Sequence, residues 1–429
     1  MTVLVGVALL LGLIAVGIPI GFALGVAGTL SLLAIAPLPT AAGLLERVVH
    51  HTAANYVLLT IPMFVLMSEF LSASGIARDL MIACNRLLRR VKGGLAVTCV
   101  LAGAILAAAS GSSTASVATI ARSTFPTMKA LGYHAGFAVG TISVSGTLAI
   151  MIPPSIAMVV YGIITEESIG RLFIAGVVPG LLTAAGYILT IALCLWLRPD
   201  LAPDLRARAA AVADDPQRGR VWPVLLLIAI VLGTLYTGVA TPTEVGAIGA
   251  AGALAITVAM RRLRLAGFAE AVGNTLRTTA MIVTIIFGAI LFGYFMAYTQ
   301  ATTAILEWIG ASGLSPAVVM AMILFFYLIL GMFMDQFAII VLTVPITHAV
   351  ATGLGFDGIW FGILIVKTAE IGLVTPPVGL NIFIASASTG VSTRDGFTGV
   401  LPFVATEIAM LILLACFPAI SLFLPDLMR

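Results

Sequence analysis

Two proline pairs have the clearest chemical consequence of any residues in the chain. Pro153-Pro154 and Pro376-Pro377 lie within the apolar segments 135–164 and 358–388. Two consecutive prolines remove two amide donors and clash with preceding carbonyls, so a helix must break there. Carbonyls freed at membrane depth are tolerated only inside protein or beside a cavity. The pairs therefore predict two broken helices whose carbonyl ends suit a hard cation such as Na⁺, whereas a divalent ion would need more carboxylates.

Two other apolar segments, 95–120 and 314–346, carry turn-forming residues at their midpoints. Gly111 is followed by a run of hydroxyl side chains, and Gly331 is followed by Asp335. Glycine gives the backbone the freedom of a tight turn, and serine or aspartate side chains accept hydrogen bonds from freed amides. We expect both segments to be re-entrant hairpins with their tips at these residues. A small-residue face for helix packing is the alternative for the first segment.

Charged residues inside apolar segments are the next candidates for function. They are Glu69, Asp335, Lys367 and Glu370. Asp335 is expected either to contribute to an ion site or to cap the hairpin tip. Lys367 and Glu370 are three residues apart and can pair on one helix face, and Glu370 could also hold the broken helix against its hairpin. Glu69 has no partner nearby in the sequence and receives no role.

The composition indicates what kind of protein positions these residues. Of the 429 residues, 61% are hydrophobic and 9% are charged, against about 25% charged in soluble domains. This excludes a soluble enzyme and a disordered chain. The net charge of +3 is too small for a nucleic-acid binder. The chain is predicted to be a polytopic membrane protein.

The basic residues decide how the segments cross the membrane. Lysines and arginines gather at 78–92, 198–220 and 261–277. Cytoplasmic loops carry such an excess, and all three groups lie on one side only if segments 95–120 and 314–346 enter and leave on the same side. The charge pattern therefore favours two hairpins rather than two further spans.

An internal repeat connects these features. Residues 132–179 align without gaps with 355–402 at an offset of 223, and the two proline pairs coincide, which argues against ordinary proline kinks. With an odd number of crossings between equivalent points, the halves have opposite orientation, as in secondary transporters. We predict an all-α polytopic membrane protein with an inverted-topology repeat, two re-entrant hairpins and two broken helices. The first repeat is expected at 1–221 (spans 2–37 and 54–74, hairpin 95–120, broken helix 135–164, span 172–197, cytoplasmic linker 198–220), and the second at 222–429 (spans 222–260 and 278–299, hairpin 314–346, broken helix 358–388, span 398–425).

Enzyme motifs give little support to a catalytic role. The sequence has no HExxH or Walker motif, and its histidines form no ligand cluster. We therefore expect no enzymatic activity and no organic cofactor. An intramembrane hydrolase that uses Asp335 or Glu370 is the alternative from another functional class.

Several motifs together resemble the large membrane subunit (the M subunit, DctM-type) of tripartite ATP-independent periplasmic (TRAP) transporters. The motifs are Ile61-Pro-Met-Phe-Val-Leu-Met-Ser-Glu-Phe, Ser110-Gly-Ser-Ser-Thr-Ala-Ser, Ile152-Pro-Pro-Ser, Gly331-Met-Phe-Met-Asp and Glu370-Ile-Gly-Leu-Val-Thr-Pro-Pro-Val-Gly-Leu-Asn. The resemblance implies a bacterial inner-membrane protein with an elevator fold like that of the ion-transporter superfamily. It implies Na⁺-driven import of an organic acid, such as a C4-dicarboxylate or a sialic acid. The implied partners are a small four-helix membrane subunit (Q-type) and a periplasmic substrate-binding protein (P-type).

The resemblance also implies which residues bind. One Na⁺ site would use Ser112, Ser113, Thr114, Gly146 and Pro153, and the other Gly331, Asp335, Thr375, Pro376 and Gly379. Weaker substrate candidates are Ser116, Pro154, Glu370 and Asn381. Lys367 departs from the family pattern, in which we expect an uncharged residue. A stand-alone Na⁺/carboxylate symporter without partner subunits is the closest alternative.

Overall fold

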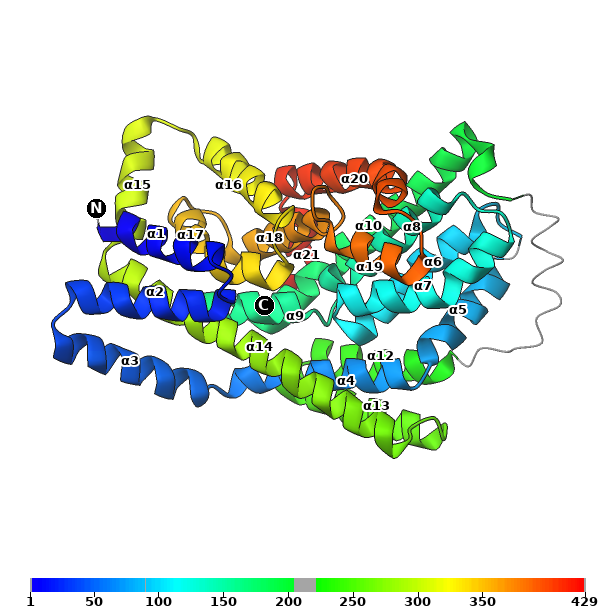
Figure 1. The fold of residues 1–429 in the computed structure, drawn as a ribbon, viewed down its shortest axis with the longest axis horizontal. Helices are drawn as coiled ribbons and strands as arrows, with labels where there is room; N and C mark the ends of the chain where they lie inside the picture. The colour runs from blue at the N-terminus through cyan, green and yellow to red at the C-terminus, as the bar shows by residue number, and fades with distance from the viewer. Residues whose placement is uncertain (1, 89, 204–220, 428–429) are drawn as a thin grey trace.

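The computed structural model describes residues 2–88, 90–203 and 221–427, and every regular element in these ranges is a helix (Figure 1). Seven of the described helices are long and apolar enough to cross a membrane. The predicted all-α membrane fold is confirmed. The predicted linker 198–220 is described only as far as Pro203, and its residues 204–220 lie outside the described part.

The first half of the chain contains ten α-helices and two short 3₁₀ turns. In chain order they are α1 (Thr2–Ala15), α2 (Ile20–Ile35), α3 (Leu38–Ala53), η1 (Tyr56–Leu59), α4 (Thr60–Ala73), α5 (Ile76–Leu87), α6 (Gly94–Ser110), α7 (Ser113–Ala130), α8 (Ala135–Met151), α9 (Ile156–Thr165), α10 (Ile169–Leu197) and η2 (Pro199–Leu201).

The second half repeats this succession with one simplification. Its helices are α12 (Trp222–Tyr236), α13 (Pro242–Ala259), α14 (Leu265–Tyr298), α15 (Ala301–Ser312), α16 (Pro316–Gly331), α17 (Gln336–Gly353), α18 (Gly358–Gly372), α19 (Leu380–Thr389), α20 (Thr393–Cys416) and α21 (Ala419–Asp426). The single 34-residue helix α14 takes the place of α3, η1 and α4. Equivalent helices match in length: α7 and α17 have 18 residues each, and α9 and α19 have 10 each.

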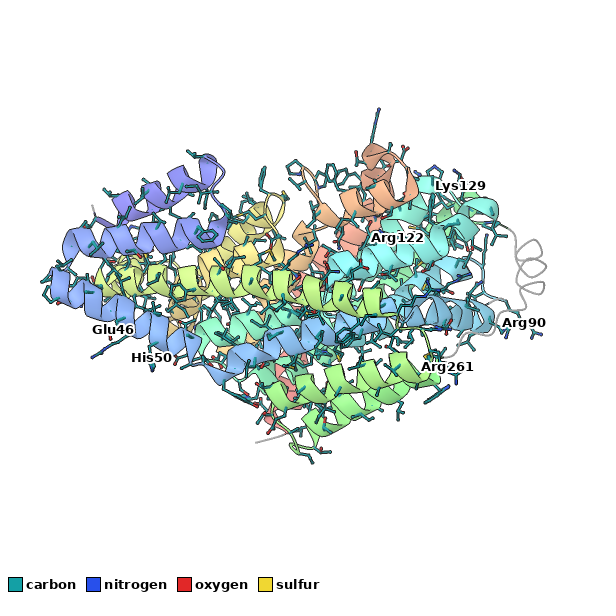
Figure 2. The ribbon with its side chains drawn as sticks, turned by 60° about the horizontal axis from the view of Figure 1, so that its bottom comes forward. Glu46, His50, Arg90, Arg122, Lys129 and Arg261 are labelled. Atoms are coloured by element: carbon teal, nitrogen blue, oxygen red, sulfur yellow. The ribbon has the colours of Figure 1, made fainter. Side chains whose placement is uncertain are left out.

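The two predicted hairpins are the pairs α6–α7 and α16–α17. Figure 1 shows them entering from opposite ends of the molecule with their tips toward the middle. In Figure 2, Arg90, Arg122, Lys129 and Arg261 gather at one end. Hairpin α6–α7 starts and finishes at this basic end, as the charge pattern predicts.

Some helices differ from the expected segments. The apolar segments of the sequence do not include α3, α5 or α15. These three helices have charged residues among their apolar ones, so they form no continuous apolar run. The apolar segments also give α7, α14 and α17 bounds that are too short. Polar and charged residues occupy one end of each of the first two helices, such as Lys129 in the last turn of α7.

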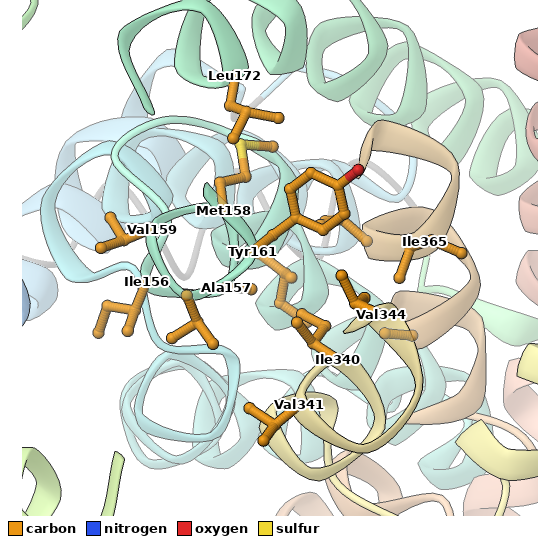
Figure 3. Close-up of a cluster of buried hydrophobic side chains, with 14 of the residues drawn as sticks. Ile156, Ala157, Met158, Val159, Tyr161, Leu172, Ile340, Val341, Val344 and Ile365 are labelled. Atoms are coloured by element: carbon orange, nitrogen blue, oxygen red, sulfur yellow. The ribbon is translucent and has the colours of Figure 1, made fainter. Parts of the chain in front are cut away.

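The two halves interlock through the short helices that follow the breaks. Helix α9 of the first half packs against hairpin helix α17 of the second, and α19 packs against α7 and α8 of the first. Figure 3 shows Tyr161 of α9 beside Val344 of α17, and Met158 of α9 beside Leu172 of α10. The Tyr161 hydroxyl donates to the Gly358 carbonyl at 2.7 Å. Each hairpin is therefore held by parts of both halves.

Candidate ion and substrate site

The first hairpin turns at Gly111, whose φ of +58° is in the left-handed region that favours glycine. Ser112 then caps α7, and its side chain accepts from the Ala115 amide at 3.5 Å. A Cβ on Gly111 would lie 3.0 Å from the carbonyl oxygen of Pro154. The tip of this hairpin therefore touches the first helix break directly.

The first break runs from the end of α8 at Met151 to the start of α9 at Ile156, and it is buried. Ser155 caps α9 by accepting from the Met158 amide at 3.4 Å. A Cβ on Gly146, in the preceding helix, would lie 3.0 Å from the carbonyl oxygen of Ser113. Backbone groups of the hairpin tip and of the broken helix therefore meet around the predicted first-site residues.

The remaining first-site candidates are hydroxyl side chains on α7. The Ser112 and Thr114 hydroxyls are 3.3 Å apart, and Ser116 pairs with Ser110 at 2.8 Å. Their oxygens lie at the hairpin turn and are of the hard type that Na⁺ prefers.

The second hairpin turns between Gly331 and Asp335, and Asp335 caps α17. Its Oδ1 accepts from the amides of Phe337 at 2.9 Å and Ala338 at 3.2 Å. The capping role that the sequence allows for this carboxylate is present, and the side chain is exposed.

The second tip also meets its helix break through backbone. A Cβ on Gly331 would lie 3.0 Å from the Cα of Gly372, the last residue of α18. The Val378 amide donates to the Met332 carbonyl at 3.2 Å. No other side chain fits between the two glycines, so this contact requires glycine on both helices.

The second break differs from the first in its exposure. Pro376, Pro377 and Val378 are exposed, whereas the equivalent residues of the first break are buried. The Thr375 hydroxyl donates to the Ile371 carbonyl at 2.6 Å. The lone pairs of the hydroxyl oxygen therefore point away from this carbonyl. Gly379, the residue before α19, has a φ of +54°. The two predicted sites are thus equivalent in position but differ in access.

Asn381 lies against the first hairpin, although it follows the second break in the sequence. Its Oδ1 accepts from the Ser113 hydroxyl at 3.4 Å, and its Nδ2 donates to the Ser143 carbonyl at 3.5 Å. The side chain is fully buried. The sequence could not show this, because the contact joins residues 268 positions apart.

The charged residues within the spans have partners. Lys367 pairs with Glu370 at 3.0 Å, as predicted, and also with Glu407 of α20 at 2.5 Å. Glu407 was missed, although an acidic residue in the predicted span 398–425 is itself a signal. Glu69 accepts from Asn274 of α14 at 3.2 Å. Glu370 is therefore part of an ion cluster rather than an open substrate contact.

Helix ends set the electrostatics of the two tips. Helices α6, α8, α16 and α18 all end at the contacts described above, so their carbonyl ends bring partial negative charge there. Helices α7, α9, α17 and α19 begin beside them, with amide ends that favour an anion. The same region therefore offers ligands for a cation and donors for a carboxylate.

The sequence matches a known protein family over most of its length. The family described as "Tripartite ATP-independent periplasmic transporter, DctM component" matches residues 7–420. The chain belongs to this family. It is accordingly a multi-pass inner-membrane transporter subunit, and the relatives' names as transporter permeases agree with the prediction that it is not an enzyme.

Two relatives illustrate the range of the DctM family. The C4-dicarboxylate TRAP transporter large permease protein DctM of Pseudomonas aeruginosa is 38% identical over 404 residues, which cover 94% of this chain and 93% of the relative. The sialic acid TRAP transporter large permease protein SiaM of Vibrio cholerae is 29% identical over 97% of both chains.

The fold is shared more widely. The structure of the Alcanivorax borkumensis YdaH transporter superposes with a TM-score of 0.68 and 13% identity, and the match covers 89% of each chain. At this identity the likeness concerns the fold alone.

Proposed function

We propose that this DctM-family subunit imports an organic acid together with Na⁺ by an elevator movement. The observation that carries the proposal is the direct backbone contact between each hairpin tip and a helix break, in both halves of the chain. These contacts gather carbonyl and hydroxyl oxygens without a cluster of carboxylates. Such a donor set fits a monovalent hard cation better than a divalent one.

The residues proposed to hold the two ions are those at the tips. Ser112, Ser113 and Thr114 with the segment from Gly146 to Pro153 would hold one ion. Gly331 and Asp335 with Thr375, Pro376 and Gly379 would hold the other. When bound, Na⁺ supplies positive charge beside the carbonyl ends of four helices. The chain's own contribution is to hold those ends together across two halves.

The proposed substrate is a carboxylate such as a C4-dicarboxylate or a sialic acid, the compounds for which the two relatives are named. Amide ends of α7 and α19 and the buried Asn381 would orient a carboxylate. Ser116 and Pro154 border the same region. A periplasmic binding protein would deliver the acid, and a small four-helix membrane subunit would complete the transporter.

The elevator movement is supported by the way the helices pack. Helices α2, α4, α13 and α14 pack on one another and form a frame, whereas the hairpins, broken helices, α10 and α20 pack together as a second group. We propose that the second group moves along the frame. Only interactions that differ between empty and loaded states can drive this movement.

Uptake into proteoliposomes tests the proposal. The full transporter, with its binding protein and small subunit, would be given radiolabelled organic acids under an inward Na⁺ gradient, and an equal K⁺ gradient serves as the control. We expect uptake that requires Na⁺ and all three components. Uptake by this chain alone would indicate a stand-alone symporter, and uptake indifferent to Na⁺ would overturn the ion assignment.

A further inference from the structure

A fully buried group of charged residues joins three helices. Lys367 and Glu370 of α18 meet Glu407 of α20, and Thr183 of α10 lies beside them. All four side chains have no solvent exposure. The three helices pack on one another (Figure 1), so water cannot stabilise the charges.

The hydrogen bonds fix the role of the lysine. The Thr183 hydroxyl donates to the Pro179 carbonyl at 2.9 Å, so Thr183 must accept from the Lys367 Nζ, 3.0 Å away. A second donor of Nζ reaches Glu370 Oε2 at 3.0 Å. An ammonium group has three donors, and Glu407 Oε2 lies 2.5 Å from the same nitrogen. The lysine is thus surrounded by acceptors, as a charged ammonium would be.

The charges of this group do not balance. One ammonium and two carboxylates would leave a net charge of −1 without solvent, which is strongly unfavourable. Glu407 Oε2 makes an ion-pair contact with Lys367, but Glu370 Oε1 and both carboxyl oxygens of Glu407 are buried and make no hydrogen bond with the described residues. The group therefore lacks one positive charge and at least one donor.

Neighbouring helices offer nothing that supplies this charge. The titratable groups described on the elements packed against α18 and α20 either bond elsewhere or lie at helix ends. Four make hydrogen bonds: Tyr161 with Gly358, Tyr187 with Thr147, Tyr327 with Thr347 and Asp395 with Ser392. Two form ion pairs: His348 with Glu167 and Arg171 with Asp426. Cys194 and Cys416 lie in the last turns of α10 and α20. His134, Glu166, Asp335, Asp357 and Arg394 lie at the helix ends.

We propose that Lys367, Glu370 and Glu407 form a proton-binding site that holds one proton on Glu407. The proton makes the group neutral and converts one oxygen of Glu407 from an acceptor into a donor. The proton is placed on Glu407 because Glu370 already accepts a hydrogen bond from Lys367, whereas neither carboxyl oxygen of Glu407 makes one with the described residues. The ligand is H⁺, and none of the three residues is among the proposed Na⁺ ligands.

Infrared spectroscopy of the full chain in lipid tests this site. A protonated carboxyl group has a C=O stretching band that ionised carboxylates lack, and the band shifts in D₂O. We expect such a band in the wild-type protein and its loss in Glu407→Gln. Glu370→Gln should also lose the band, because Glu407 then balances Lys367 as an ion. In Lys367→Met the band should rise about twofold, since two buried carboxyl groups then need protons.

Glu69→Gln is the matched control, because Glu69 also lies within a helix and pairs with an amide; the band should not change. An acid band that Glu407→Gln and Glu370→Gln both leave intact would overturn the proposal. A wild-type spectrum without the band would also overturn it. If the melting temperature of the protein then depends on Na⁺ or K⁺, a metal cation neutralises the group instead. If Glu407→Gln does not fold, Lys367→Met decides: an unchanged band contradicts the proposal.

Discussion

At the residue scale, a single buried amide connects the two halves at the first hairpin. Asn381 follows the second proline pair, yet its side chain bonds Ser113 of the first hairpin and the carbonyl of Ser143. Because of this connection, a movement of the first hairpin would also move the residues that follow the second helix break. Substituting such a residue should change the Na⁺ dependence of uptake and not only the free energy of unfolding.

Asn381→Leu tests this connection. The substitution removes both hydrogen bonds, so the Ser113 hydroxyl and the Ser143 carbonyl each lose a partner. We expect this to cost about 1–3 kcal/mol of folding free energy. If about 1.4 kcal/mol of this falls on the ion-bound state, the Na⁺ concentration for half-maximal uptake rises about tenfold. Asn274→Leu is the control, because Asn274 of α14 bonds Glu69 of α4 and neither residue belongs to a hairpin; an equal shift in both variants would contradict the assignment.

Asp335 offers a second test, because its capping role has a counterpart elsewhere. Asp335 caps α17 through two amides, and Asp357 caps α18 in the same way at 2.8 and 3.0 Å. Alanine at either position should lower stability by about 1 kcal/mol. Only Asp335→Ala should also weaken Na⁺ activation of uptake. Thermal unfolding and Na⁺ titration separate the two effects, and matching losses would leave Asp335 as a cap alone.

At the element scale, each hairpin is placed by contacts that only small residues permit. Gly331 and Gly372 bring the backbones of α16 and α18 together. In the first half, a Cβ on Gly103 of α6 would lie 2.5 Å from the Ser145 carbonyl of α8. Such close approach lets the carbonyl ends of two helices share one site.

Gly372→Ala should therefore displace the second hairpin tip. The new Cβ would lie 2.5 Å from the Gly331 carbonyl oxygen, so the backbones must separate at a cost of about 1–3 kcal/mol. We expect a lower melting temperature and weaker Na⁺ activation. Gly273→Ala in α14 is the control, because nothing lies within 4 Å of its Cβ position and alanine favours a helix by about 1 kcal/mol. Equal behaviour of the two variants would contradict the contact.

Much of this arrangement could be predicted because its causes are local. Proline pairs must break helices, and glycine followed by hydroxyl or acidic side chains gives a turn, so the breaks and tips lie where the sequence predicts. Helices α3, α5 and α15 were missed because charged residues interrupt their apolar faces. The contact of α19 with the first hairpin and the partner Glu407 depend on packing between distant segments, which no local pattern encodes.

At the scale of the whole molecule, the frame helices α2, α4, α13 and α14 contact the hairpin group at few places. One of them is between α14 and α17, where a Cβ on Gly293 would lie 3.9 Å from the Cβ of Pro345. This separation matches that of disulfide-bonded cysteines, about 3.5–4.5 Å. A movement of one group along the other must separate this pair.

The double variant Gly293→Cys/Pro345→Cys should therefore lock the transporter. Cys194 and Cys416, the cysteines that are not buried, would be replaced by alanine in the background. Oxidation should abolish uptake and reduction should restore it, whereas neither single-cysteine variant should respond to oxidant. Full uptake by the cross-linked protein would contradict an elevator movement across this interface.

Coupled flux is the decisive test of Na⁺-driven import, because it measures the ion and the acid together. The complete transporter in proteoliposomes would receive radioactive sodium and a radiolabelled organic acid, and the entry of both would be followed with time. The two hairpin sites predict that Na⁺ enters with the acid in a fixed ratio, and that Ser113→Ala and Asp335→Ala each reduce both fluxes. Acid entry that proceeds without Na⁺ entry would contradict the account.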